Sequence, residues 1–171
     1  PVPDVDILLM ESTYGGRFHE APSRDDETFC RAIKEALELG CRVYIPAFAV
    51  ERTQQLLYLL NRAYHEGTLP LLPVYVDSPM AVGATEIFRI HPECFNKEVY
   101  DFLFREKDPF CFEQLRLIRS VGESQALNKM NGQAIIISAS GMCEAGRILH
   151  HLANNIGYPV YYTHLTLPTK A

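Results

Sequence analysis

The chain has 171 residues and a net charge of −5, with 47% hydrophobic and 22% charged residues. These values are typical of a globular domain with a substantial core, and no apolar run approaches the roughly 20 residues that span a membrane, so we expect no membrane partner. The negative charge argues against a domain that coats nucleic acid through a broadly basic surface, but not against a local basic cleft. Five scattered cysteines without a Cys-x-x-Cys pair predict reduced core thiols in a cytoplasmic protein.

Strands and helices are predicted to alternate along the chain. The apolar run 5–10 predicts a first buried strand, and Ser23 is a suitable N-cap for a helix that Gly40 ends. A second strand is expected over 42–45, followed by a helix that stops at Gly67.

The second half of the chain continues this alternation. It predicts a strand over 72–76, then a helix capped by Ser78 with Pro79 at its first position. Pro92 is expected to open a further helix, residues 115–120 a half-polar strand, and residues 123–130 another helix. The β-branched run 135–137 predicts an interior strand that leads directly, through small residues, into a last helix.

The alternation predicts an α/β fold, a Rossmann-like and mostly parallel sheet flanked by helices. Ligands of such sheets bind outside the carboxyl ends of the strands, where the turns that follow the strands meet. The turn 138–141 contains two serines and a glycine, and the amides at the start of a helix favour an anion. A phosphate-binding turn and an ordinary strand-to-helix turn both fit these residues.

The strand-end motifs resemble those of the β-CASP group of metallo-β-lactamase-fold nucleases, which process RNA. The resemblance rests on four motifs in order: ESTYG at 11–15, PAFAVER at 46–52, YVDSPMA at 75–81, and SASGM at 138–142 followed by Gly146-Arg147. Each motif is weak by itself, but four in order at compatible spacing are specific. They are most similar to the bacterial and archaeal ribonuclease branch related to the pre-mRNA 3′-end cleavage endonuclease.

This resemblance implies an enzyme of two lobes. In the family, a metallo-β-lactamase lobe binds two zinc ions through a His-x-His-x-Asp-His motif and further ligands, the β-CASP lobe closes over it, and RNA passes between them. The resemblance implies that a zinc-bound hydroxide attacks the phosphodiester. It places Glu11 in the acidic motif, whose carboxylate supports a histidine that acts on the leaving group.

The chain departs from the whole enzyme in its metal ligands. It has no His-x-His-x-Asp-His, and its histidines lack zinc spacing, so we expect no metal site here, an inactive chain, and two zinc ions only in the full-length enzyme. A start without Met or signal peptide suggests a longer protein. We predict that residues 1–16 are an end strand and loop leading from the absent metallo-β-lactamase lobe, 17–157 the β-CASP domain, and 158–171 a poorly ordered, non-native tail, because 162–169 resembles a translated sequencing adapter.

The candidate site residues follow from these motifs. Glu11 is the predicted catalytic residue. The predicted contacts to RNA phosphate are Ser138, Ser140, Gly141, Met142, Arg147 and Arg52. The predicted lining of the cleft is Ser12, Thr13, Tyr14, Asp77 and Ser78. Other roles stay open, because the two arginines suit surface salt bridges, Asp77 and Ser78 suit capping, and Tyr14 suits packing. His150 and His151, late in the last helix, are expected to face solvent or the helix C-terminus.

The predicted function is therefore the β-CASP lobe of a zinc-dependent ribonuclease, with RNA and the missing lobe as partners and a homodimer left open. The first alternative is a non-catalytic scaffold homologue in an RNA-processing complex. The second is an unrelated phosphate-binding α/β domain, which has little support because no Gly-x-Gly-x-x-Gly motif or P-loop follows a strand.

Overall fold

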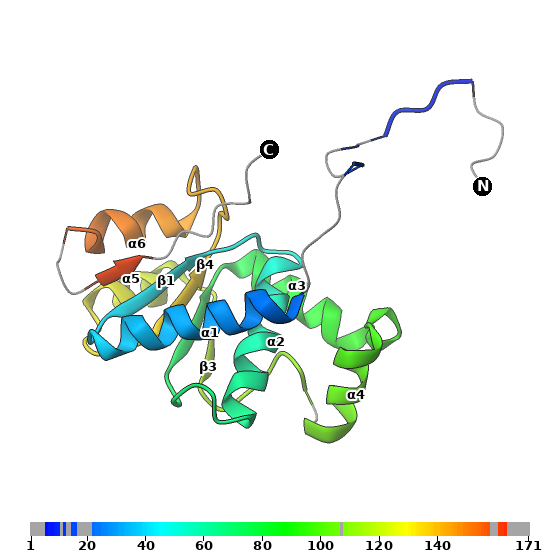
Figure 1. Cartoon of the computed structure of the whole chain (residues 1–171). Coiled ribbons are helices and arrows are strands. Elements are labelled where there is room, and N and C mark those ends of the chain that lie inside the picture. The colour runs from blue at the N-terminus through cyan, green and yellow to red at the C-terminus, as the bar shows by residue number, and fades with distance from the viewer. Residues whose placement is uncertain are drawn as a thin grey trace.

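A computed structural model describes residues 6–10, 12, 15–16, 22–106, 108–157 and 161–163. Helices and strands alternate along the described chain, and Figure 1 shows the helices packed around a twisted sheet. The elements in chain order are α1 (Pro22–Glu38), β1 (Arg42–Pro46), α2 (Arg52–His65), β2 (Val74–Asp77), α3 (Pro79–Ile90), the 3-10 turn η1 (Pro92–Cys94), α4 (Lys97–Glu106), β3 (Leu115–Ile118), α5 (Val121–Lys129), β4 (Ile135–Ser138), α6 (Arg147–Asn155) and β5 (Tyr161–Thr163).

The strands form one sheet in the order β3-β2-β4-β1-β5, and every pairing in it is parallel. The prediction of an α/β fold with a mostly parallel sheet is thus confirmed. The chain passes from β1 to β2 and leaves a gap between them, which β4 fills later as the central strand. Because β4 is covered on both faces, Ile135, Ile136 and Ile137 are almost completely buried, as an interior strand requires.

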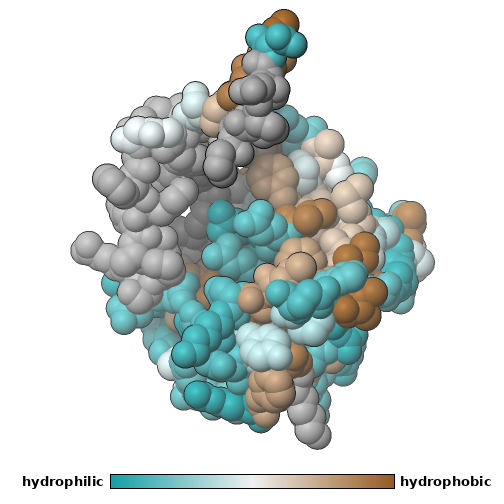
Figure 2. All heavy atoms as spheres, turned by 90° about the vertical axis from the view of Figure 1, so that its right-hand side faces the viewer, coloured by the Kyte–Doolittle hydropathy of each residue, from teal (hydrophilic) through white to brown (hydrophobic). Residues whose placement is uncertain are grey.

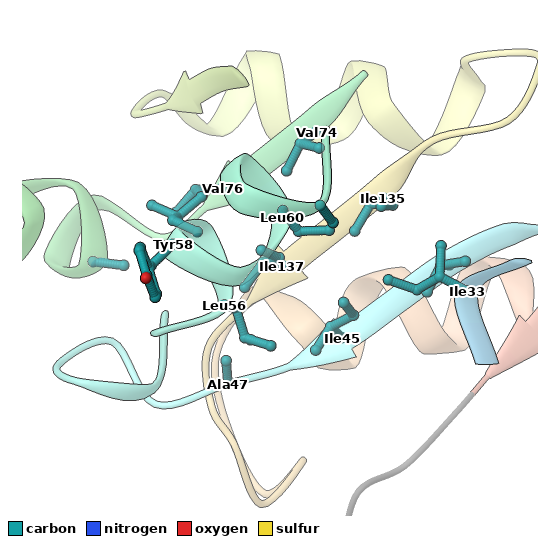
Figure 3. Packing of buried hydrophobic residues seen from close by; sticks show 14 of the residues in the cluster. Ile33, Ile45, Ala47, Leu56, Tyr58, Leu60, Val74, Val76, Ile135 and Ile137 are labelled. Carbon is teal, nitrogen blue, oxygen red and sulfur yellow. The ribbon is translucent and has the colours of Figure 1, made fainter. Parts of the chain in front are cut away.

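One face of the sheet packs against α1, α2 and α3 through an apolar cluster. Alternate residues of a strand point to the same face, so Ile135 and Ile137 of β4 project together toward Leu60 of α2 (Figure 3). We use the name apolar cluster for the buried side chains of this face that Figure 3 labels: Ile33, Ile45, Ala47, Leu56, Tyr58, Leu60, Val74, Val76, Ile135 and Ile137.

The opposite face of the sheet is covered by α5 and α6, which pack against each other. Its apolar part is small and consists of Tyr44, Ile118, Leu127 and Ile136. Asp77 lies on this second face, because it alternates with Val76 of the apolar cluster along β2. This face therefore combines apolar packing with buried polar groups.

The predicted helix ends at glycine are confirmed. Gly40 after α1 and Gly67 after α2 have φ angles of 76° and 67°, in the left-handed region that favours glycine. The predicted cap of α3 is confirmed as well, since the Ser78 hydroxyl accepts a hydrogen bond from Ala81 N and Pro79 opens the helix.

The predicted first strand over 5–10 is wrong for its described part. Residues 6–10 have no regular structure, and the side chains of Ile7 and Leu9 are 81% and 91% exposed. An apolar run becomes a buried strand only where a neighbouring strand pairs with it, and the described sheet ends at β3 and β5 without including these residues.

Three predicted boundaries are also corrected. The third strand begins at Val74 rather than at residue 72, because Pro73 before it has no N–H for the sheet. The helix expected at Pro92 is divided into η1 and α4, since Asn96 starts a new helix by accepting a hydrogen bond from Val99 N. The last helix does not follow β4 directly, because the loop 139–146 lies between Ser138 and Arg147.

The described part of the predicted tail forms a strand. Tyr161–Thr163 make up β5, which pairs in parallel with β1. The poor order expected for the tail stays a prediction. Aromatic and β-branched residues favour such an edge strand. Whether 158–171 belongs to the native sequence stays a prediction. Within the described parts of the chain, no helix is both long and apolar enough to cross a membrane.

Candidate functional site

The loops that follow β1, β2 and β4 meet at the carboxyl edge of the sheet. In the strand register, Ser138 lies between Pro46 of β1 and Asp77 of β2. The loops also touch one another, because a Cβ added to Gly141 would lie 3.0 Å from the backbone nitrogen of Phe48. The structure thus brings three of the four predicted motifs together, as the parallel strands require.

Asp77 is the centre of this edge, and its side chain is fully buried. Its Oδ1 accepts a hydrogen bond from Arg147 Nη1 at 2.6 Å, and its Oδ2 accepts from Ser124 Oγ at 2.5 Å. His151 Nε2 lies 2.6 Å from the same Oδ2. We use the name Asp77 cluster for Asp77, Ser124, Arg147 and His151. It connects the end of β2 with α5 and with α6.

The hydrogen bonds of the Asp77 cluster determine how Asp77 ionises. Burial by itself would raise the pKa of the Asp77 carboxyl, but the hydrogen bonds from His151, Ser124 and Arg147 outweigh it and lower the pKa below its ordinary value. Asp77 is therefore a buried carboxylate held in its charged form by donors on two helices. The suggestion that it caps its loop is replaced by this role, whereas Ser78 does cap α3.

The Asp77 cluster contains a serine, a histidine and an aspartate, but not in the arrangement of a nucleophilic triad. In a triad the histidine stands between the serine and the aspartate. Here Ser124 Oγ and His151 Nε2 both lie against Asp77 Oδ2, and all three residues are buried. The cluster therefore has the geometry of a buried support and not of a hydrolytic nucleophile.

Arg147 is the member of the Asp77 cluster that reaches the surface. Its side chain is 19% exposed, and besides Asp77 it contacts Arg119, whose carbonyl oxygen accepts a hydrogen bond from Arg147 Nη2 at 2.9 Å. A guanidinium has five N–H groups in a fixed plane. These two contacts orient that plane at the carboxyl edge, beside the loop 139–146.

The loop 139–146 is folded back on itself and joined to α6. Ser140 N donates to Ala145 O, and Ile148 N donates to Ala139 O. Gly146 has a φ of 82°, and a Cβ at this position would lie 2.4 Å from Ala139 O, so only glycine fits here. Ser140 is partly exposed, and its hydroxyl accepts a hydrogen bond from Ala145 N at 3.4 Å.

The other predicted site residues that the structure describes do not form hydrogen bonds with the Asp77 side chain. Ser138 is buried, and its hydroxyl donates to the main-chain oxygen of Asp77 at 2.9 Å. Arg52, exposed at the start of α2, donates to Gln55 Oε1 at 2.8 Å. Ser12 is exposed. Glu11, Thr13 and Tyr14 lie outside the described residues, so their predicted roles stay predictions.

Exposed apolar side chains lie in the loops after β1 and β4 and at the start of α3. Phe48 and Val50 follow β1, Met80 follows β2, and Met142 follows β4, and each is between 43% and 70% exposed. Apolar and hydrophilic side chains are also interspersed over the face of the molecule in Figure 2. Aromatic side chains such as that of Phe48 are surfaces on which unstacked bases can stack.

His151 and Ser124 are the residues that the sequence analysis missed. His151 was expected near solvent or the helix end, but it is completely buried between Asp77 and Asn128. A signal was present in the sequence, because Arg147, His151 and Asn155 are spaced four residues apart and so share one face of α6. For Ser124 the sequence carried no comparable signal.

The described residues do not form a zinc site. In the parts of the chain that the structure describes, no three His, Cys, Asp or Glu residues are grouped so that they could hold a metal ion. His151 is directed at Asp77 and Asn128, both of which also serve other partners. We therefore assign no step of metal chemistry to these residues.

Comparison with known proteins identifies the family. The family model described as Beta-Casp domain matches residues 53–161, which run from the start of α2 to β5, and the chain belongs to this family. The suggested unrelated phosphate-binding domain is therefore excluded. The chain is 36% identical to ribonuclease TTHA0252 of Thermus thermophilus over 92% of the chain's own length. It is 31% identical to the transcription termination factor FttA of Methanococcus maripaludis over 89%, and 30% identical to an RNase J-like protein of Methanocaldococcus jannaschii over 88%.

The chain spans only a part of these relatives. It covers 36% of the Thermus ribonuclease, 34% of the RNase J-like protein and 24% of FttA. The relatives place the chain in a family of nucleases and RNA-processing proteins.

Proposed function

We propose that this chain forms the RNA-binding side of the cleft in a zinc-dependent ribonuclease of metallo-β-lactamase fold. The observation that supports the proposal most is the position of Arg147. The buried Asp77 carboxylate holds its guanidinium at the carboxyl edge of the sheet, and 19% of the side chain remains exposed there. Family membership and two relatives named as ribonucleases supply the reaction class.

In this proposal the phosphate is bound by directed donors and not by net charge. Asp77 neutralises one positive charge of the edge, so attraction depends on the N–H groups of Arg147 that its contacts with Asp77 and Arg119 leave over. The hydroxyl of Ser140 and the backbone at Gly141 lie in the adjacent loop. Met142 and Phe48 offer apolar surface for a base, and Arg52 adds a second cation at the rim.

The catalytic part of the proposal rests on the sequence. Glu11 would support proton transfer to the leaving group through a histidine of the metallo-β-lactamase lobe, and that lobe would hold two zinc ions. When bound, the zinc ions would supply the hydroxide and stabilise the charge that develops on the phosphate. In the full-length protein, Glu11→Ala should lower turnover strongly while zinc content stays constant, and normal turnover would refute the role of Glu11.

The phosphate-binding role is tested by RNA affinity in the full-length protein that contains this chain. Arg147→Ala should weaken RNA binding about tenfold and lower the slope of log affinity against log salt by about one. Arg31→Ala is the matched control, because Arg31 is an exposed arginine of α1 with a salt bridge to Glu35. Equal affinities of the Arg147→Ala variant and the unchanged protein at low salt would refute the proposal.

Relatives named as transcription termination factors favour a second candidate function, in which the same edge binds RNA to end transcription. If the chain binds RNA without any cleavage, it acts as a non-catalytic scaffold in an RNA-processing complex. Sequencing the gene on either side of this chain distinguishes an enzyme from a non-catalytic scaffold, since an upstream His-x-His-x-Asp-His motif would show that zinc ligands are kept.

A further inference from the structure

The buried His151 has both ring nitrogens directed at oxygen atoms. Its Nε2 lies 2.6 Å from Asp77 Oδ2, and its Nδ1 lies 2.8 Å from Asn128 Oδ1. Asn155 Nδ2 donates to the same Asn128 oxygen at 3.0 Å, so this oxygen is an acceptor and His151 Nδ1 is a donor. The ring is thus held in one orientation between α5 and the end of β2, with Tyr44 packed 5.9 Å from its centre.

This fixed ring determines which oxygen of Asp77 is left for Arg147. Oδ2 is taken by His151 and Ser124, and Oδ1 is the oxygen that Arg147 contacts. Two donors hold Oδ2 of the carboxylate, so the group cannot rotate freely about the Cβ–Cγ bond of Asp77. The direction in which Arg147 presents its guanidinium therefore depends on His151, although the two side chains contact different oxygens.

We propose that His151 is a positioning residue for RNA binding, which acts through Asp77 to orient Arg147 and does not touch RNA itself. This inference rests on the proposed function of Arg147 as a phosphate contact. Full burial excludes a direct contact of the His151 side chain with RNA in this arrangement. A glutamine at position 151 can meet one of the two acceptors but cannot bridge both as the rigid ring does.

The test is a double-mutant cycle on RNA affinity in the full-length protein that contains this chain. Arg147→Ala should weaken binding about tenfold and His151→Gln about fivefold, while the double variant should lose about tenfold and not the about fiftyfold of independent sites. In turnover assays His151→Gln should raise KM and leave kcat unchanged. The matched control is His150→Gln, because His150 is the exposed neighbour of His151 on α6 and should bind RNA normally.

The outcomes separate the positioning role from a merely structural one. Losses that multiply to about fiftyfold would overturn the inference, because an effect independent of Arg147 would then explain His151. A folded His151→Gln variant with normal affinity would overturn it too, while Arg147→Ala still weakened binding. If Arg147→Ala has no effect, the proposed function fails instead. Should His151→Gln not fold, Asn128→Ala removes the oxygen that accepts from both His151 Nδ1 and Asn155 Nδ2, and it must show the same non-additivity with Arg147→Ala.

Discussion

The two faces of the sheet hold their helices in different ways. The apolar cluster joins α1, α2 and α3 to the sheet by burying side chains such as Leu60 and Ile135, which have no preferred partner. The Asp77 cluster joins α5 and α6 to the end of β2 by hydrogen bonds between specific atoms. A substitution in the apolar cluster should therefore lower stability in proportion to the buried apolar area that it removes. A substitution in the Asp77 cluster should cost more, because it leaves the remaining buried polar groups without a partner.

Removing the Asp77 carboxylate should produce the largest loss of unfolding free energy, because it disrupts the Asp77 cluster. Asp77→Ala leaves the buried donors of His151 and Ser124 without their acceptor, so we expect a loss of about 3–5 kcal/mol of unfolding free energy. Urea unfolding of the 171-residue chain measures the loss. Asp77→Asn, which keeps one acceptor oxygen, should lose less, and an equal loss would contradict the hydrogen-bond explanation.

A cavity in the apolar cluster should cost somewhat less and leave the polar face intact. Leu60 is fully buried against the sheet, so Leu60→Ala should lower the unfolding free energy by about 3 kcal/mol through lost contacts and a residual cavity. The same urea experiment measures this loss. In the full-length protein, RNA affinity of the folded Leu60→Ala variant should stay unchanged, and a large loss of affinity would show that the two faces are not independent.

Protonation of Asp77 in acid should act on the polar face and give the smallest of the three effects, a part of what Asp77→Ala removes. The pKa of Asp77 lies below its ordinary value of 3.8 because of the hydrogen bonds from its three donors, which outweigh the effect of burial. A lowered pKa means that the carboxylate contributes stability above pH 3.8, and that this contribution is lost as the pH falls through the lower pKa of the folded state. The difference in unfolding free energy between the unchanged chain and Asp77→Asn should therefore shrink in acid, and a constant difference would contradict it.

The ends of helices were predicted correctly from sequence where a few neighbouring residues determine them. The glycines at positions 40 and 67 ended helices, and Ser78 with Pro79 began one, because these features depend on the backbone of a few neighbouring residues. The apolar run 6–10 failed for the opposite reason. Its burial depends on a neighbouring strand, which the described residues do not provide.

The candidate site was predicted only in part. Parallel strands made it possible to expect the turns after β1, β2 and β4 at one edge, and the structure brings them together there. The position of Arg147 at this edge was predicted, but its buried partner Asp77 was not. The sequence predicted Asp77 in the lining of the cleft and left a capping role open, because its neighbours Ser78 and Pro79 suit the start of a helix.

The class of fold, the family resemblance and the edge where the candidate residues gather could all be predicted from the amino-acid sequence. These three predictions depend on hydrophobic periodicity, turn residues and the order of the motifs, all of which can be recognised in short segments of sequence. The contact between Asp77 and His151, which lies 74 residues further along the chain, became visible only in the folded structure. That contact requires β4 to lie between β1 and β2 and α6 to turn one face inward, and such an arrangement depends on the whole sheet.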